Sequence, residues 1–142
     1  MPKQPDESPG FLLWHVTLRW QRAIAAALHP LDLTHVQFVL LASAWWLNRA
    51  GEAPRQHALA AHAGTDVKMT SQVLQKLEDK GLVERAVDPS DTRAKLLRVT
   101  ERGAAVAQRA IEVVEAADAR FFAATPDARG LVDLLRPLAA RR

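Results

Sequence analysis

Residues 64–103, GTDVKMTSQVLQKLEDKGLVERAVDPSDTRAKLLRVTERG, decide how this chain folds. Asp66 is placed to begin a helix, because its carboxylate can accept hydrogen bonds from the N–H groups of the first turn. Gly81 is placed to end that helix in the left-handed conformation that glycine adopts readily. Between them, hydrophobic residues recur at steps of three and four, which predicts a helix with one apolar side. The residues of that side are Met69, Val73, Leu74 and Leu77.

Two short strands are expected after this helix, at residues 82–87 and 96–99. Between them, residues 88–91 read Asp-Pro-Ser-Asp, which is typical of a tight turn, since Pro fixes its own φ and Asp bonds to nearby N–H groups. Thr100 is placed to cap a further long helix. A helix joined to a two-stranded hairpin is the plan of a winged helix-turn-helix, in which the hairpin is the wing.

The remainder of the chain is expected to be helical. Predicted helices cover residues 11–28, 35–49, 55–63 and 101–124, and Thr34 with Gln37 forms a capping-box pattern at the second of them. A last helix is predicted at residues 127–140, with Thr125 as its cap and Pro126 in its first position. Pro137 is expected to distort this helix or to end it early. Residues 1–10 are predicted to be a flexible tail.

Length and composition narrow the function classes. The 142 residues fit one domain, and with 49% hydrophobic and 25% charged residues a packed core is expected. The absence of cysteine excludes disulfides and cysteine-ligated zinc. The longest apolar run, residues 38–47, is too short to span a bilayer, so no membrane partner is expected. The net charge of +3 is compatible with a nucleic-acid partner.

These patterns resemble those of the multiple-antibiotic-resistance regulator (MarR) family of bacterial transcription factors. The wing carries that family's Asp-x-Arg pattern and the strand that closes in Thr, here Asp91, Arg93, Leu97, Val99 and Thr100. Residues 33–40 and 77–83 resemble the entry to the second helix and the exit from the recognition helix. The resemblance extends from about residue 11 to the C-terminus. It departs at Gln72, where a basic residue is commoner.

The resemblance implies a mainly α-helical fold with a small β-hairpin wing. Residues 11–142 would form a single MarR-like domain, with the winged helix-turn-helix at about 34–100 and dimerisation helices at about 11–29 and 101–142. The implied function is a sequence-specific, double-stranded DNA-binding regulator in the bacterial cytosol, associated with the nucleoid. It would be a homodimeric repressor released by a small-molecule effector. Two alternatives stay open: a winged-helix protein-interaction module without DNA binding, and a ligand-independent activator.

Candidate DNA contacts follow from the side chains that the helix and the wing present. Glutamine suits adenine, lysine suits guanine or phosphate, and serine and threonine bond to either. In the wing, Arg93 is predicted to enter the minor groove, with Asp91 orienting its guanidinium. The start of the preceding helix is expected to meet a phosphate. The predicted contacts are Arg55, Gln56, His57, Lys68, Thr70, Ser71, Gln72, Gln75, Lys76, Asp91, Arg93, Lys95 and Arg98.

The resemblance also implies a cleft for a small aromatic or phenolic effector. Trp14, His15, Arg19, Trp45 and Trp46 are its candidate lining residues; the alternative is that these tryptophans fill the core and the dimer interface, as large aromatics usually do. No cofactor is expected. The five histidines are scattered without acidic partners, so no metal site is predicted, and no catalytic motif is present, so the chain is not expected to be an enzyme.

Overall fold

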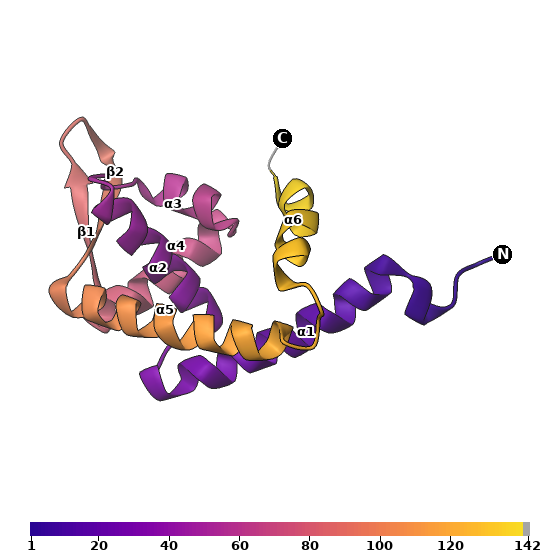
Figure 1. Ribbon diagram of the computed structural model, residues 1–142. Helices are drawn as coiled ribbons and strands as arrows, with labels where there is room; N and C mark the ends of the chain where they lie inside the picture. Colours follow the sequence, from indigo (N-terminus) through magenta and orange to yellow (C-terminus); the bar gives the residue numbers. More distant parts are fainter. Residues whose placement is uncertain (141–142) are drawn as a thin grey trace.

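The computed structural model describes residues 1–140 and follows the predicted helical plan with one hairpin (Figure 1). Short 3-10 turns at Pro5–Glu7 and His29–Leu31 flank the first helix. The elements are α1 Pro9–Leu28, α2 His35–Arg49, α3 Gln56–Ala63, α4 Val67–Asp79, β1 Val83–Asp88, β2 Asp91–Val99, α5 Glu101–Phe122 and α6 Ala128–Ala139.

The predicted starts of α2, α4 and α5 are confirmed by their capping contacts, whereas α1 begins at Pro9, two residues before its predicted start and inside the predicted tail, with Ser8 as its cap. Thr34 and Gln37 form the complete capping box of α2, with two side-chain to backbone bonds of 3.2 Å. The Asp66 carboxylate accepts from the backbone N–H of Met69 at 2.8 Å, and the Thr100 hydroxyl oxygen accepts from that of Gly103 at 2.9 Å. These contacts join residues three apart, so the local sequence alone specifies them.

The start of the last helix was predicted wrongly. Asp127, not Thr125, caps α6, because its carboxylate accepts from the N–H of Gly130 at 2.8 Å, whereas the N–H of Thr125 still bonds to the carbonyl of Phe122 in the turn after α5. Pro137 lies inside α6, which continues to Ala139. The helix thus ends two residues after this proline. The predicted domain extends to residue 142, and residues 141–142 lie outside the described residues.

One hydrophobic core holds α2, α3, α4 and the hairpin together. We call residues 33–99, which contain these elements, the lobe. The same core includes buried alanines of α5 and the residues Ile24 and Leu28 near the C-terminal end of α1. The hydrophobic side chains of the lobe with 0% exposure are Leu40, Leu41, Ala44, Leu59, Leu74, Leu77 and Leu97.

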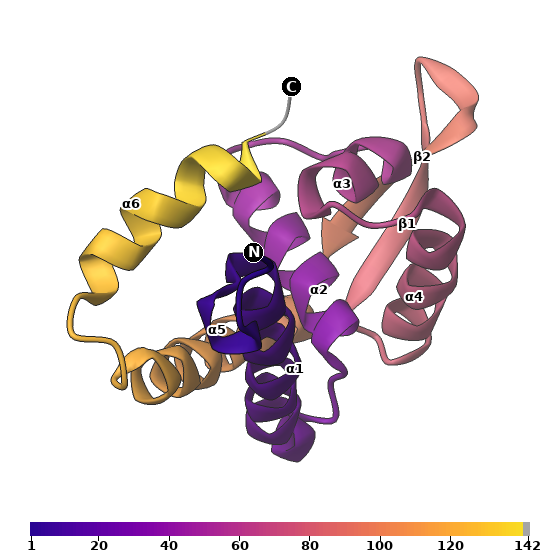
Figure 2. The ribbon, with the colours of Figure 1, turned by 90° about the vertical axis from the view of Figure 1, so that its right-hand side faces the viewer.

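The helices α1, α5 and α6, which we call the frame, are covered far less completely. Within the described residues, α6 has no buried side chain, and it stands apart from the lobe (Figures 1 and 2). The N-terminal half of α1 extends beyond the lobe (Figure 1). A largely apolar hollow of about 330 Å³ lies between these helices, lined by Leu12, Leu13, Val16, Thr17, Trp20, Phe122, Leu131 and Leu135.

No single described helix is both long and apolar enough to cross a membrane. The bent pair made of residues 9–31 and α2 satisfies the requirement together, by length and composition alone, with 73° between its two parts.

Candidate nucleic-acid interface

A groove of about 610 Å³ lies between the start of α3, the first turns of α4 and the hairpin. The two helices and the hairpin that form it lie side by side in Figure 2. It brings together seven of the predicted DNA contacts, from three separate parts of the sequence. Its lining residues are Arg55, Gln56, His57, Val67, Ser71, Arg85, Asp91, Arg93, Ala94 and Lys95.

The first turn of α4 is fixed by hydrogen bonds that also remove one predicted contact. Thr70 is fully buried, its hydroxyl lying 2.6 Å from that of Thr65 and donating to the Asp66 carbonyl at 2.7 Å. The prediction that Thr70 contacts DNA is therefore wrong, because its side chain points into the lobe. Met69, expected on the apolar side, is instead 38% exposed.

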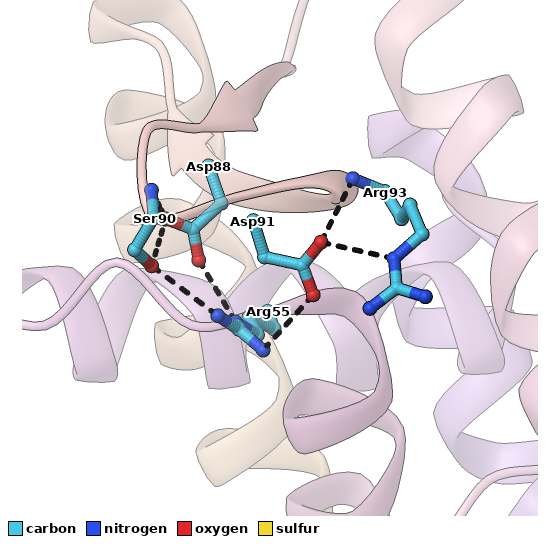
Figure 3. A network of polar contacts seen from close by, with 5 residues as sticks. All are labelled: Arg55, Asp88, Ser90, Asp91 and Arg93. Atoms are coloured by element: carbon cyan, nitrogen blue, oxygen red, sulfur yellow. Dashed lines mark hydrogen bonds and ion pairs between the residues drawn. The ribbon is translucent and has the colours of Figure 1, made fainter.

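At the wing, Asp91 holds Arg93 as predicted (Figure 3). One carboxylate oxygen of Asp91 accepts from the backbone N–H of Arg93 at 3.1 Å and from its Nε at 3.3 Å. The side chain of Arg93 is nevertheless 91% exposed, while that of Asp91 is 29% exposed. The carboxylate therefore orients a guanidinium whose remaining N–H groups face solvent.

Arg55 was predicted to meet a phosphate, but its guanidinium braces the hairpin (Figure 3). Its Nε donates to Asp88 at 2.8 Å and its Nη2 to the Ser90 hydroxyl at 3.4 Å, while its Nη1 lies 4.0 Å from Asp91. The backbone of Arg55 also contacts the hairpin, because it forms a β-bridge with Leu96 of β2. The start of α3 is thereby tied to both strands of the wing.

Asp88 is a buried carboxylate at the hairpin turn, and the prediction of turn chemistry there is confirmed. It accepts from the backbone N–H of Ser90 at 2.9 Å and from its hydroxyl at 2.8 Å. These two bonds lower the pKa of Asp88 below its ordinary value, with a further contribution from Arg55, and together they outweigh the opposing effect of burial. The carboxylate is thus held in its charged form.

Arg85 on β1 was not predicted as a site residue, yet it joins three elements. Its side chain is only 13% exposed and bonds to Glu78 and Gln75 of α4 and to Gln56 of α3. The alternation of side chains along the strand could have indicated this position. Arg85 lies two residues after the buried Val83 and therefore on the same side of β1.

The other predicted contacts lie in three places. His57, Ser71 and Lys95 line the groove, and Lys68, Gln72 and Lys76 are exposed on α4. Arg98 is exposed at the opposite end of β2 from the turn, paired in register with Glu84, and it is not among the groove residues.

The five candidate effector residues come from two separate places in one chain. Trp14, His15 and Arg19 are exposed on α1, and the Trp14 side chain is 65% exposed. Trp45 and Trp46 lie near the end of α2 and pack edge to face, with 4.9 Å between their ring centroids. The nearby Asn48 side chain forms hydrogen bonds with the backbone of β2. None of the five lines the frame hollow. Among the described residues, no cluster of three metal-ligating side chains occurs.

Comparison with known proteins gives relatives over nearly the whole chain. A model of the MarR family matches residues 33–95. The chain is 47% identical over 120 residues to the HTH-type transcriptional regulator YdcH of Bacillus subtilis (strain 168), covering 84% of this chain and 82% of that protein. It is 39% identical over 121 residues to the HTH-type transcriptional repressor Rv2887 of Mycobacterium tuberculosis (strain H37Rv), covering 83% of each.

Solved structures of similar fold include complexes with DNA and with small molecules. CouR bound to a 23-mer DNA duplex matches with a TM-score of 0.84 and 27% identity, over 95% of this chain and 94% of that one. CouR from Rhodococcus jostii RHA1 bound to p-coumaroyl-CoA matches with a TM-score of 0.80 and 28% identity, over 96% of this chain and 92% of that one. Rv2887 in complex with p-aminosalicylic acid matches with a TM-score of 0.71 and 35% identity, over 94% of this chain and 99% of that one.

Proposed function

This chain belongs to the MarR family of DNA-binding transcriptional regulators, and we propose that it is a homodimeric repressor of a pseudo-palindromic site. The observation that carries the proposal is the groove between α4 and the wing, with the exposed Arg93 on one side and the exposed face of α4 on the other. Each protomer would place α4 in a major groove and Arg93 in the flanking minor groove. The protein acts by binding and carries out no reaction, in the bacterial cytosol.

The side chains around the groove are proposed to have different roles in DNA binding. Lys68, Ser71 and Gln72 face the bases, while His57, Lys76 and Lys95 meet phosphates. Arg55 and Asp91 hold the wing in place rather than touching DNA themselves. Gln56 offers its amide N–H groups, since its amide oxygen is bonded to Arg85.

The partner proposed for the frame is a second copy of the chain. Large hydrophobic side chains of α1 and α6 are exposed in a single protomer, which is costly unless another surface covers them. They include Leu13 at 55%, Trp14 at 65%, Leu134 at 71% and Leu138 at 81%. A two-fold pair would bury them and set a fixed distance between the two α4 helices, to match half-sites one helical turn apart.

The effector proposed is a small aromatic acid or phenol that changes this distance. Rv2887 and CouR have been crystallised with p-aminosalicylic acid and p-coumaroyl-CoA, both of which carry a substituted benzene ring. Trp14, His15 and Arg19 would meet Trp45 and Trp46 in a cleft completed by the second protomer. The aromatic side chains would stack on the ring and the cationic ones would pair with an anionic group.

The test is a salt titration of binding to the duplex upstream of the protein's own gene, with a scrambled duplex as control. A repressor of its own promoter should bind the upstream duplex more tightly, with log affinity falling linearly in log salt. Addition of p-aminosalicylic acid should weaken that binding and leave the scrambled control unchanged. Absence of binding to either duplex at low salt would contradict the proposal.

A further inference from the structure

Two glutamines one turn apart on α4 have different surroundings. Gln75 is engaged at both ends of its amide, because its oxygen accepts from Nη2 of Arg85 and its nitrogen donates to the Asp79 carboxylate at 2.9 Å. Gln72 is exposed, and its side chain makes no hydrogen bond within residues 1–140. From the sequence both were equal candidates for contacting adenine.

Arg85 is the residue that separates them. Its guanidinium also lies 3.3 Å from the Glu78 carboxylate and donates to the amide oxygen of Gln56 at 3.3 Å. The planar guanidinium is a rigid fork, so three partners on two helices fix its orientation and it fixes theirs. Arg85 lines the groove, but only 13% of its side chain is exposed, because its partners on the two helices cover most of it.

We propose that Arg85 is a positioning residue that determines base preference, by holding Gln75 out of the major groove and leaving Gln72 to read adenine. A glutamine recognises adenine through both its amide oxygen and its amide nitrogen, acting together on one base edge. Gln75 would have to release Arg85 and Asp79 to do this, whereas Gln72 has both groups available. The inference rests on the proposed DNA-binding function and names the side chain that carries its specificity.

The experiment compares Gln72→Ala with Gln75→Ala, which are matched because they delete the same side chain from the same helix. Full-length protein selects duplexes from a random pool, and sequencing gives the base preference at each position. We expect Gln72→Ala to reduce the preference for adenine at one position of each half-site by roughly fivefold or more. Gln75→Ala should leave the profile unchanged. A profile that depends on Gln75 as strongly as on Gln72 would overturn the proposal.

A second comparison tests Arg85 itself. Arg85→Met has no donors, so it should free the amide oxygen of Gln75 and leave its amide nitrogen only the exposed bond to Asp79. Gln75 should then be able to exchange that bond for a base edge and alter the preference at a neighbouring base pair. The double variant Arg85→Met with Gln75→Ala should lose that new preference. A uniform loss of affinity with an unchanged profile would show a purely structural role and would refute the proposal. Circular dichroism of Arg85→Met checks folding, and the glutamine pair remains decisive should that variant not fold.

Failure of this inference is distinguishable from failure of the proposed function. A wild-type protein that enriches no sequence contradicts site-specific binding and, with it, the assignment to Gln72. A wild-type protein that enriches a site whose profile is insensitive to Gln72→Ala contradicts only the proposed roles of Gln72 and Arg85 in base preference.

Discussion

Leu74 of α4 and Leu138 of α6 are both leucines on amphipathic helices, yet Leu74 is fully buried while Leu138 is 81% exposed. The lobe around Leu74 surrounds its hydrophobic residues with its own elements and α5. Among residues 1–140, no element covers Leu138 in this way. The difference teaches that folding of the lobe is completed within a protomer, whereas the outer part of the frame needs a partner surface.

The lobe and the frame also differ in their polar contacts. In the lobe, Arg55 and Arg85 are bonded to protein groups and hold elements in place, whereas the Arg93 side chain is 91% exposed. The frame contributes Trp20, whose indole N–H donates to Asp118 at 2.8 Å. Trp20 also packs edge to face on His35 of α2, so this cluster is where the frame meets the lobe.

The largest expected effect on stability is that of Leu74→Ala. Loss of a fully buried leucine should reduce the free energy of unfolding by about 2–5 kcal/mol, from the lost burial and the cavity that remains. Leu138→Ala should cost less than about 0.5 kcal/mol at dilutions where the protein is monomeric, because little area is buried there. Urea unfolding measures both. Equal losses in dilute samples would contradict the contrast between the two regions.

The next effect concerns the frame as a dimer surface. Leu135→Glu places a charge in the apolar hollow between α1 and α6, and it should dissociate the proposed dimer. DNA affinity should then fall by about 100-fold, since a monomer gives up the phosphate contacts of one half-site. Light scattering and a DNA titration measure the two outcomes. Gln108→Glu, which adds the same charge at an exposed site on α5, should change neither.

Gly103→Ala tests how tightly α5 is packed on the lobe. An added Cβ would overlap the Leu82 carbonyl oxygen, which accepts from the N–H of Thr100, and would come within 2.8 Å of a Val99 methyl carbon. We expect a loss of about 1–3 kcal/mol, although alanine normally favours a helix over glycine. Gly10→Ala in α1 meets nothing within 4 Å and is the control. Thermal unfolding that is equally unaffected in both variants would show that α5 has room at this position.

Arg93→Ala tests the wing arginine that lies next to Asp91 and has a side chain that is 91% exposed. Its exposure predicts no change in the unfolding free energy, while DNA affinity should fall by about tenfold through loss of a minor-groove contact. Fluorescence anisotropy with a labelled duplex measures the affinity. Arg109→Ala, on the exposed side of α5, should leave it unchanged. An unchanged affinity for Arg93→Ala would remove the wing from recognition.

The smallest effect is a pH dependence at the junction of the two regions. Burial lowers the pKa of His35, and the nearby Asp118 opposes this only in part. The unfolded chain therefore binds a proton more readily, so stability should fall as the pH drops below about 6.5. His35→Gln should lose less stability than the wild type between pH 7.5 and pH 5. Equal losses in urea unfolding would contradict a lowered pKa for the half-buried His35.

Much of the fold could be predicted because its signals are local. The caps at Thr34, Asp66 and Thr100 join residues three apart, and Gly81 adopts the left-handed φ of 74° that was expected after α4. The Asp91–Arg93 contact spans two residues and was predicted for the same reason. Where two local caps competed, as at Thr125 and Asp127, the sequence pattern chose wrongly.

What the sequence determined by itself was therefore the order of helices and hairpin, the family resemblance and the exposure of Arg93. Only the tertiary structure decided that Thr70 is buried, that Arg55 braces the wing and that Arg85 holds Gln75 and Gln56. Arg55 and Asp88 are 33 residues apart, and Arg85 and Gln56 are 29 apart. Such pairs form because packing of the hydrophobic core brings distant segments together, and no local pattern reports which polar side chains then meet.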